Sequence, residues 1–443
     1  MSAEEAAGKA PPADPSAPQA GGAQVVDSVP AVEPVRKGSP FEALQHRDFR
    51  LYWAGSFVSQ LGSQMRLVAV GVQLWDLTHS FTAMGILGLV KLVPLLGLSL
   101  FGGVIADAFD RRRLLIATQA IMAVSSVLLG LATDMGWATP FLIYAISALT
   151  SATVAFDNPA RGALVPNLVP RRHLPNALSL NIIVWQVATI VGPTLAGFFV
   201  AIGTHGLALI YWIDAVSFTA VILALWLMRT RPQVETTRNV SLSAVFDGFR
   251  FLRRTPIILS TMSLDFFATF FGAATLLLPA VAEQILQVDR QYWGVLYSAP
   301  AVGALLAGAV MSWVGNVRHQ GWIVLGSVAA YGIATLIFGI STSYAITLLA
   351  LAGTGAADTV SMVMRQTIRQ LSTPDKLRGR MTSVNMMFYM GGPQLGELRA
   401  GVVAAVIGLG PSIAVGGLGV LFAAVVTGVL VPSLRRYDRD TGE

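Results

Sequence analysis

The stretch that decides the fold is FTAMGILGLVKLVPLLGLSLFGGVIADAFDRRR, residues 81–113. It contains a long apolar run, residues 82–106, in which Lys91 is the one charged side chain, and it ends on three arginines at positions 111–113. A helix needs about 20 mostly apolar residues to cross a bilayer. Arginines in a short loop mark the cytoplasmic side of a membrane. The stretch therefore predicts a helix that crosses a membrane and ends at its cytoplasmic face.

The composition of the whole chain agrees with that prediction. The 443 residues are 54% hydrophobic and 12% charged, whereas soluble domains carry about 25% charged residues. The formal net charge of +6 comes from arginines clustered between apolar runs, so no nucleic-acid partner is expected. Cysteine is absent, which removes disulfides, thiolate nucleophiles and cysteine metal sites. With no phosphate-binding loop and no histidine cluster, the sequence predicts neither an enzyme nor a metal site.

Apolar runs separated by charge clusters predict twelve spans. They lie near residues 51–77, 82–106, 113–133, 139–158, 177–203, 207–228, 259–283, 291–313, 321–341, 344–366, 381–406 and 410–432. Lysines and arginines gather in alternate connections, and the remaining connections lack them, with Arg290 as the exception. This alternation predicts a multi-pass protein with both termini in the cytoplasm.

The chain divides into two halves around one long polar connection. We expect a disordered cytoplasmic tail at 1–40, a six-helix bundle at 41–229, a cytoplasmic linker with an amphipathic helix at 230–255, a second six-helix bundle at 256–434 and a cytoplasmic tail at 435–443. A shift of 204 positions superimposes Arg161 on Arg365 and Asn181 on Asn385, among other identities. Such repeats are typical of transporters whose binding site lies between two parallel halves.

Two motifs carry a family resemblance. Gly103-Val-Ile-Ala-Asp107-Ala-Phe-Asp110-Arg111-Arg112-Arg113 resembles the signature between helices two and three of the major facilitator superfamily, which usually has glycine where Asp110 stands. Gly192-Pro193-Thr-Leu-Ala-Gly197 in the fifth span is similar to the glycine-proline motif of the superfamily's exporters. Residues 157–161, 166–170, 176–181, 371–380 and 395–397 further resemble the exporter branch that includes the enterobactin exporters.

The resemblance implies an all-α membrane protein of twelve transmembrane helices in two pseudo-symmetric six-helix bundles. It implies a secondary active transporter of the bacterial inner (cytoplasmic) membrane, a proton-coupled exporter of small amphipathic or anionic molecules that works by alternating access. Its partners would be a small-molecule substrate and the lipid bilayer, and it would act as a monomer without an ATPase subunit or a cofactor, driven by the proton gradient. A facilitated uptake carrier of the same fold and a non-transporting membrane receptor or assembly factor stay open as alternatives.

The two motifs supply the expected gating residues. They are Gly103, Asp107, Arg111, Arg112, Gly192, Pro193 and Gly197. Glycines permit close helix packing, a carboxylate can face a helix dipole, and a proline removes a backbone hydrogen bond and can bend its helix. The alternatives are that the arginines only fix the topology and that the small residues only serve packing.

Three acidic residues within the spans, Asp265, Asp358 and Glu397, are the candidates for proton coupling. A charge at a helix centre costs about 3 kcal/mol on insertion scales, so such residues usually face a cavity or a partner. Asp358 and Arg365 lie two helical turns apart and share a face. Glu397 could instead form a fixed pair with Arg399. We interpret Asp157 with Arg161 as a local pair and Asp214 as structural.

The substrate-binding candidates are cations, amides and aromatic side chains within the spans. They are Arg66, Lys91, Gln60, Gln64, Trp185, Phe266, Phe270 and Tyr389. Two cations at mid-depth with few obvious acidic neighbours could receive an anion, unless Arg66 pairs with Asp265 or another carboxylate. The aromatic residues could stack a planar ligand, or they could face lipid or the core.

Overall fold

The computed structural model describes residues 41–108, 110–230, 252, 255–314, 318–373 and 378–438. These residues are almost entirely helical, and none of them is in a strand. The expected all-α fold is therefore confirmed. The predicted tail at 1–40 and nearly all of the predicted linker at 230–255 lie outside the described residues, as do positions 439–443.

Each half contributes six membrane-length segments. The first half contains η1 (Glu42–Gln45), α1 (Arg47–Thr78), α2 (Phe81–Ala108), α3 (Arg111–Asp134), α4 (Pro140–Leu164), η2 (Val165–Asn167), η3 (Arg171–His173), α5 (Leu174–Val200) and α6 (Thr204–Leu227). The second half contains α8 (Pro256–Gly272), η4 (Thr275–Leu277), α9 (Leu278–Ala280), η5 (Val281–Ile285), η6 (Arg290–Tyr292), α10 (Trp293–Val314), α11 (Gln320–Ile340), α12 (Tyr344–Ser372), α13 (Arg378–Ile407), α14 (Leu409–Leu430) and α15 (Pro432–Arg435).

Ten helical segments of the described chain are long and apolar enough to cross a membrane. The two long helices outside that set, α1 and α13, carry more charge, including Arg66 and Asp76 in α1 and Glu397 and Arg399 in α13. Large apolar side chains such as Trp226, Phe422 and Leu349 are at least two-thirds exposed. This is the pattern of a protein whose surrounding solvent is lipid.

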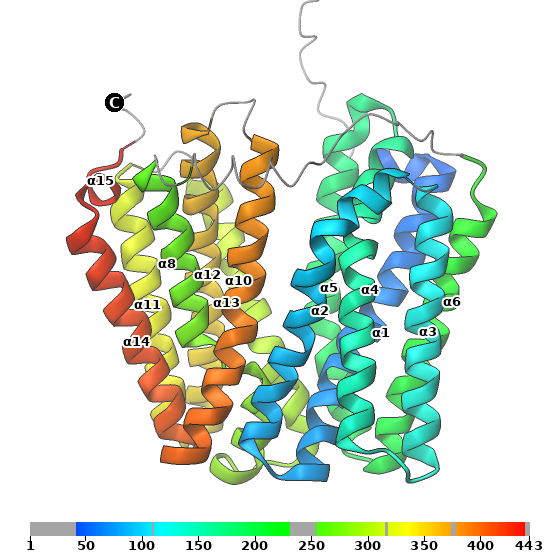
Figure 1. Cartoon of the computed structure of the whole chain (residues 1–443), viewed down its shortest axis with the longest axis horizontal. Helices are drawn as coiled ribbons and strands as arrows, with labels where there is room; N and C mark the ends of the chain where they lie inside the picture. Colours follow the sequence, from blue (N-terminus) through cyan, green and yellow to red (C-terminus); the bar gives the residue numbers. More distant parts are fainter. Residues whose placement is uncertain are drawn as a thin grey trace, which may run out of the picture. The chain divides into compact units, whose positions relative to one another are not determined.

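The two halves meet at one end of the bundle. Figure 1 shows α1 to α6 on one side and α8 to α14 on the other. We call the end at which α1 begins and α14 finishes the terminal face, and the opposite end, with the α1–α2 and α13–α14 connections, the far face. The ribbons of α2 and α13 lie together near the far face and diverge toward the terminal face (Figure 1).

Glycines allow the close approach of the halves near the far face. A Cβ added to Gly85 of α2 would lie 3.0 Å from the backbone oxygen of Leu398 on α13. A Cβ on Gly197 of α5 would lie 2.6 Å from the backbone oxygen of Gln291, next to α10. Small residues permit this kind of backbone contact between membrane helices. The structure is therefore closed at the far face.

The seventh span, predicted near 259–283, contains a break that hydropathy does not show. Helix α8 ends at Gly272, Ala273 is extended with ψ of 127°, and the chain restarts at Thr275 as η4, α9 and the π-helical turn η5. Tyr331 packs so close to Gly272 that a Cβ there would lie 2.2 Å from its ring, and Pro279 cannot donate a backbone hydrogen bond. The predicted seventh span is therefore present, at Pro256–Ile285, and its helix is interrupted after Gly272.

Candidate functional site

A buried arginine joins two carboxylates in the second half. Arg365 of α12 places Nη2 2.8 Å from Oδ1 of Asp265 on α8 and 3.5 Å from Oδ1 of Asp358, two turns away on α12. The side chains of Arg365 and Asp265 are 3% and 6% exposed, whereas that of Asp358 is 46% exposed. Breaking a buried pair by removing one partner is costly, so Asp265 fixes the arginine. Asp358 is the more accessible of the two carboxylates.

Asp358 lines a cavity of 240 Å³ enclosed by α8, α10, α11, α12 and α13. The break between α8 and η4 forms one wall, and Glu397 lies on another. Glu397 accepts hydrogen bonds from the backbone N–H groups of Thr275 at 2.9 Å and Leu276 at 3.1 Å. Two of the three carboxylates predicted to couple protons, Asp358 and Glu397, therefore line the same cavity, beside the interrupted helix.

Arg399 serves the other end of the break. Its guanidinium donates to the backbone oxygens of Phe271 at 2.7 Å and Phe270 at 3.3 Å, the last turn of α8. The orphan carbonyls of one helix end and the orphan N–H groups of the next segment are thus satisfied by Arg399 and Glu397, two residues apart on α13. Glu397 and Arg399 therefore cap the two ends of the break, and the structure shows these contacts instead of an ion pair between the two residues.

In the first half, Arg66 does have an acidic partner. Its Nε lies 2.9 Å from Oδ2 of Asp214 on α6, which also accepts a 2.5 Å hydrogen bond from Ser126. Asp214 is fully buried. The considered pairing of Arg66 with Asp265 is not found, because Asp265 is bound to Arg365.

Lys91 has no ion pair within 4.0 Å among the residues that the structure describes. It lies within electrostatic range of Glu397 and Arg66. Gly88, one turn before it on α2, contacts Gln394 and Glu397 of α13. Lys91 is therefore a cation at the contact between the halves.

The other substrate-binding candidates are distributed over both halves. Gln64 donates to Thr189 of α5 at 2.8 Å, while Gln60 lies one turn earlier on α1. Phe266 stacks on Phe270 with ring centroids 6.1 Å apart. Tyr389 is 50% exposed and Trp185 is 52% exposed. Among the described residues, none of the eight candidates lines the cavity that Asp358 and Glu397 share.

The expected gate at the α2–α3 connection binds helix ends of its own half. Arg112 donates to the backbone oxygens of Trp226 at 2.9 Å and Met228 at 3.2 Å, at the end of α6. Arg111 donates to Ala163 near the end of α4 at 3.3 Å. Cations at helix C-termini are favourable. The side chains of Gly103 and Asp107 lie outside the described residues.

Asp110, which departs from the family signature, begins α3. Its side chain accepts hydrogen bonds from the backbone N–H groups of Arg112 at 2.8 Å and Arg113 at 3.3 Å. Aspartate is a preferred N-cap residue. The sequence contained this signal, because Asp110 stands directly before the next apolar run.

The glycine-proline motif of α5 lies against both α1 and α10. A Cβ on Gly192 would lie 3.0 Å from the backbone oxygen of Leu61, and a Cβ on Gly294 would lie 1.9 Å from that of Pro193. Helix α5 continues through Pro193 to Val200. Close helix crossing at this motif agrees with the expectation, and its part in gating stays a prediction.

An ion pair that the sequence did not predict joins the two halves at the far face. Arg290 donates from Nη1 and Nη2 to the two carboxylate oxygens of Asp76, both at 2.8 Å. Its guanidinium lies 5.2 Å from the ring centroid of Trp293. Beside it, Trp75 of α1 donates its indole N–H to Glu283. This far-face tie explains why Arg290 was the exception to the charge pattern of the connections.

The pseudo-symmetric counterpart of Arg365 is also buried in an ion pair. Arg161 of α4 lies 2.5 Å from Asp157, as the sequence predicted, and Asp157 accepts hydrogen bonds from Thr118 at 2.7 Å and Gln119 at 2.8 Å. In the first half, Arg161 is thus held by one carboxylate that accepts further hydrogen bonds. In the second half, Arg365 contacts two carboxylates, and that of Asp358 is partly exposed. Within the described part of the chain, no cluster of three His, Asp or Glu side chains is arranged to hold a metal ion.

Twelve spans in two halves that contact at one face, with buried ion pairs inside each half, define a transporter of the major facilitator superfamily. The chain belongs to the family described as transmembrane secretion effectors, whose model matches residues 38–441.

Known proteins resemble this chain in sequence over most of its length and in fold. The chain is 25% identical over 397 residues to the "Enterobactin exporter EntS" of Shigella boydii and to that of Escherichia coli O157:H7, covering 88% of this chain and 94% of each relative. The crystal structure of the nucleoside transporter NupG superimposes with a TM-score of 0.69 at 13% identity, covering 88% of this chain and all of that one. A bacterial homologue of the iron transporter ferroportin, in an inward-facing state, gives 0.67 at 15% identity, covering 88% and 99%. These structures are similar in fold.

Proposed function

We propose that this protein is a proton-coupled exporter of small amphipathic or anionic molecules. The observation that carries the proposal is the triad of Asp265, Arg365 and Asp358, in which one carboxylate is buried and the other is exposed to a cavity. One arginine and two carboxylates give the triad a net charge of −1, and protonation of Asp358 brings it to zero. Since burying a net charge in a membrane protein is costly, the protonated triad passes more easily through a closed state.

Asp358 is the proton carrier in this proposal, and Asp265 positions Arg365. The second carboxylate that lines the cavity, Glu397, accepts hydrogen bonds from two backbone N–H groups of the segment that follows the helix break. Glu397 therefore contributes mainly by holding the broken helix next to Lys91 and the first half. Of the three candidate carboxylates, Asp358 is therefore the one that we propose as the proton carrier.

Alternating access requires the far-face tie between Asp76 and Arg290 to open while the terminal face closes. We assign the terminal face to the cytoplasm, because Arg111, Arg112 and Arg171 lie there. In this proposal both termini are cytoplasmic, and the closed far face is the outer face. The arginines of the α2–α3 connection, with Gly103 and Asp107, are the proposed gate on that face.

Export is favoured over uptake by the relatives, which are named enterobactin exporters at 25% identity. The glycine-proline motif of α5, which resembles that of exporters, points the same way. Lys91, which makes no ion pair among the described residues, and the aromatic side chains of α8 would supply charge and apolar surface to an amphipathic anion. Dyes, antibiotics and catecholate siderophores are therefore the compounds to screen.

The proposal is tested by substrate-induced proton movement in proteoliposomes. An imposed pH gradient should drive accumulation of at least one of these compounds, and the compound should in turn release protons. The uptake alternative predicts flux in the opposite direction in inverted vesicles, and a receptor predicts binding without flux. Accumulation that is insensitive to an uncoupler would contradict proton coupling.

A further inference from the structure

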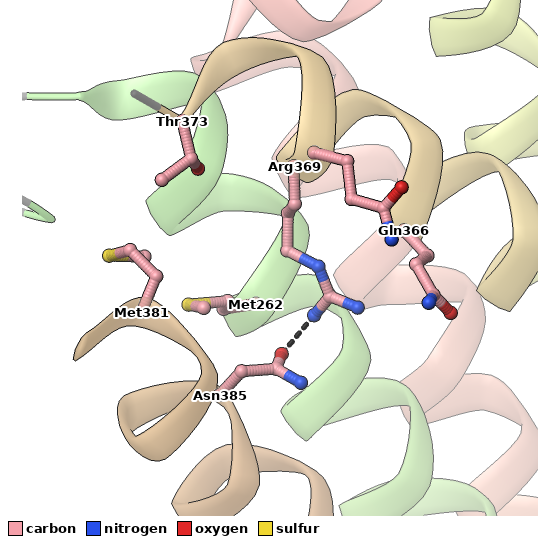
Figure 2. A pocket seen from close by; sticks show the side chains of 7 residues that line it. Met262, Gln366, Arg369, Thr373, Met381 and Asn385 are labelled. Atoms are coloured by element: carbon pink, nitrogen blue, oxygen red, sulfur yellow. Dashed lines mark hydrogen bonds between the residues drawn. The ribbon is translucent and has the colours of Figure 1, made fainter. Parts of the chain in front are cut away.

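A second cavity lies at the terminal-face end of the second half, outside the triad. It has a volume of 430 Å³ and lies between α8, α12 and α13. Its lining residues are Met262, Gln366, Arg369, Gln370, Thr373, Met381 and Asn385. Figure 2 shows Gln366, Arg369 and Thr373 on one side of the cavity, with Met262 and Met381 near one another opposite and Asn385 facing the guanidinium.

Among the described residues that line this cavity, the one charged side chain is Arg369. Arg369 is half-buried and donates a hydrogen bond to the neutral amide oxygen of Asn385. It makes no ion pair within 4.0 Å among the described residues. One turn away, Arg365 is held by two carboxylates. Asp265 acts on Arg369 only through its longer-range charge, and the hydrogen-bond partner of Arg369 among the described residues is a neutral amide. Such an arginine suits an anion, because guanidinium binds carboxylate and phosphate groups in a bidentate manner.

The other lining residues complement such an anion. Gln366, Gln370 and Asn385 carry amide groups that can donate hydrogen bonds. Met262 and Met381 offer polarisable apolar surface, which adapts to the shape of an aromatic or aliphatic group. None of the lining residues is acidic. The cavity therefore combines one cation, several amides and an apolar wall.

The fold does not require this set of residues. At the offset of 204 positions that superimposes Arg161 on Arg365, the positions of Gln366, Arg369 and Gln370 correspond to Gly162, Val165 and Pro166 in the first half. The asparagine is shared, because Asn181 superimposes on Asn385. The arginine and the glutamines are thus specific to the second half, near the terminal face, toward which α2 and α13 diverge (Figure 1).

We propose that this cavity is an entry site for an organic anion, in which a carboxylate or phosphate group binds Arg369 and an apolar body packs on Met262 and Met381. The inference rests on the proposed function and names its substrate class as anionic. Next to the triad, the site would receive the anion before it moves toward Asp358 and the space between the halves. A free organic acid and an anionic lipid headgroup share this chemistry, so the experiment separates them.

The test measures binding of naphthoate, with naphthamide as the neutral isostere, to the full-length protein in nanodiscs of phosphatidylcholine. Equilibrium dialysis with empty nanodiscs as the blank gives the affinity. We expect naphthoate to bind at least about 10-fold more tightly than naphthamide, and Arg369→Gln to weaken naphthoate binding by about 10- to 100-fold, the range for one charged hydrogen-bonding group. Arg369→Lys, which keeps the charge but loses the planar fork, should fall between them.

The matched control is Arg171→Gln, an exposed arginine of η3 on the same face of the other half, which should bind naphthoate as the wild type does. Adding phosphatidylglycerol to the nanodiscs identifies the source, since a lipid headgroup at this site would compete with naphthoate in the wild type. Equal naphthoate affinity in the wild type and Arg369→Gln, or equal affinity for naphthoate and naphthamide, would overturn the proposal. Binding needs no gradient, so a failure of proton coupling would leave this result intact.

Discussion

Neutralising Arg290 should shift the transporter toward a state that is open at the far face. The bidentate contact with Asp76 joins the halves there, and both side chains are partly exposed, at 36% for Arg290 and 24% for Asp76. Solvent screening limits such a pair to about 0.2–1 kcal/mol. The cation–π contact with Trp293 adds about 0.5–1 kcal/mol. Together, about 1–2 kcal/mol changes the ratio of the two states by roughly 5- to 30-fold.

The assay is a distance distribution between spin labels on cysteines introduced at Ser80 and Ser343, in the far-face connections of the first and second halves. The chain has no cysteine of its own, so no background residues need removal. Arg290→Gln should populate a longer distance than the wild type. Asp134→Asn is the matched control, because Asp134 bonds Trp212 at 2.8 Å at the far face within one half.

The Asp76→Asn variant should lengthen the distance in the same way, and the double variant should add little to either single change, since both remove one contact. An unchanged distribution in Arg290→Gln, or effects of the two variants that simply add, would refute the role of this pair in holding the far face closed.

Three further predictions concern other parts of the chain. Gly294→Ala on α10 should hinder closure of the far face, because the added Cβ would lie 1.9 Å from the backbone oxygen of Pro193. Gly308→Ala is the control, because its Cβ would meet nothing within 4 Å. The spin-label distances above measure closure, and identical distance distributions for the two variants would contradict the prediction. Glu397→Gln should lower the stability of the purified protein by about 1–3 kcal/mol. The two N–H groups of the helix break donate to different carboxylate oxygens, and glutamine replaces one of these oxygens with an NH2 group. An unchanged midpoint of thermal unfolding would contradict the capping role of Glu397. The pKa of His46 is lowered below its usual value of 6.5 by burial and by the charges of His173 and Arg172. Docking of η1 should therefore be stable above pH 6.5 and should weaken as the pH falls through that value. Hydrogen-exchange protection of residues 41–46, corrected for intrinsic rates, should depend on pH in this way in the wild type and should lose the pH dependence in His46→Gln.

Much of the fold could be predicted from the sequence, because a bilayer forces the backbone to satisfy its hydrogen bonds within helices. The apolar runs and arginine clusters therefore marked the segments from α1 to α14 to within several residues. The break after Gly272 could not be predicted in this way. Residues 273–282 remain apolar, so hydropathy is continuous across it. Gly272 and Pro279 were the available signals, but both residues also occur within unbroken membrane helices.

The candidate site was predictable in its residue types but not in its pairings. A charged residue within a span signals a partner, and this principle selected Asp265, Asp358 and Arg66. Which helices face each other decides the partner, and so Asp214 for Arg66 came from the structure. The far-face tie was hidden for the same reason, because Asp76 and Arg290 lie 214 positions apart.

In the proposed mechanism, Asp358 carries the coupled proton. Two activities of Asp358→Asn are to be compared in proteoliposomes, using the compound that releases protons from the wild type. We predict that exchange between preloaded and external compound survives, since asparagine keeps the shape of the site, while accumulation driven by a pH gradient is lost. The Asp134→Asn control should retain both activities. Accumulation by Asp358→Asn at the wild-type level would contradict the account.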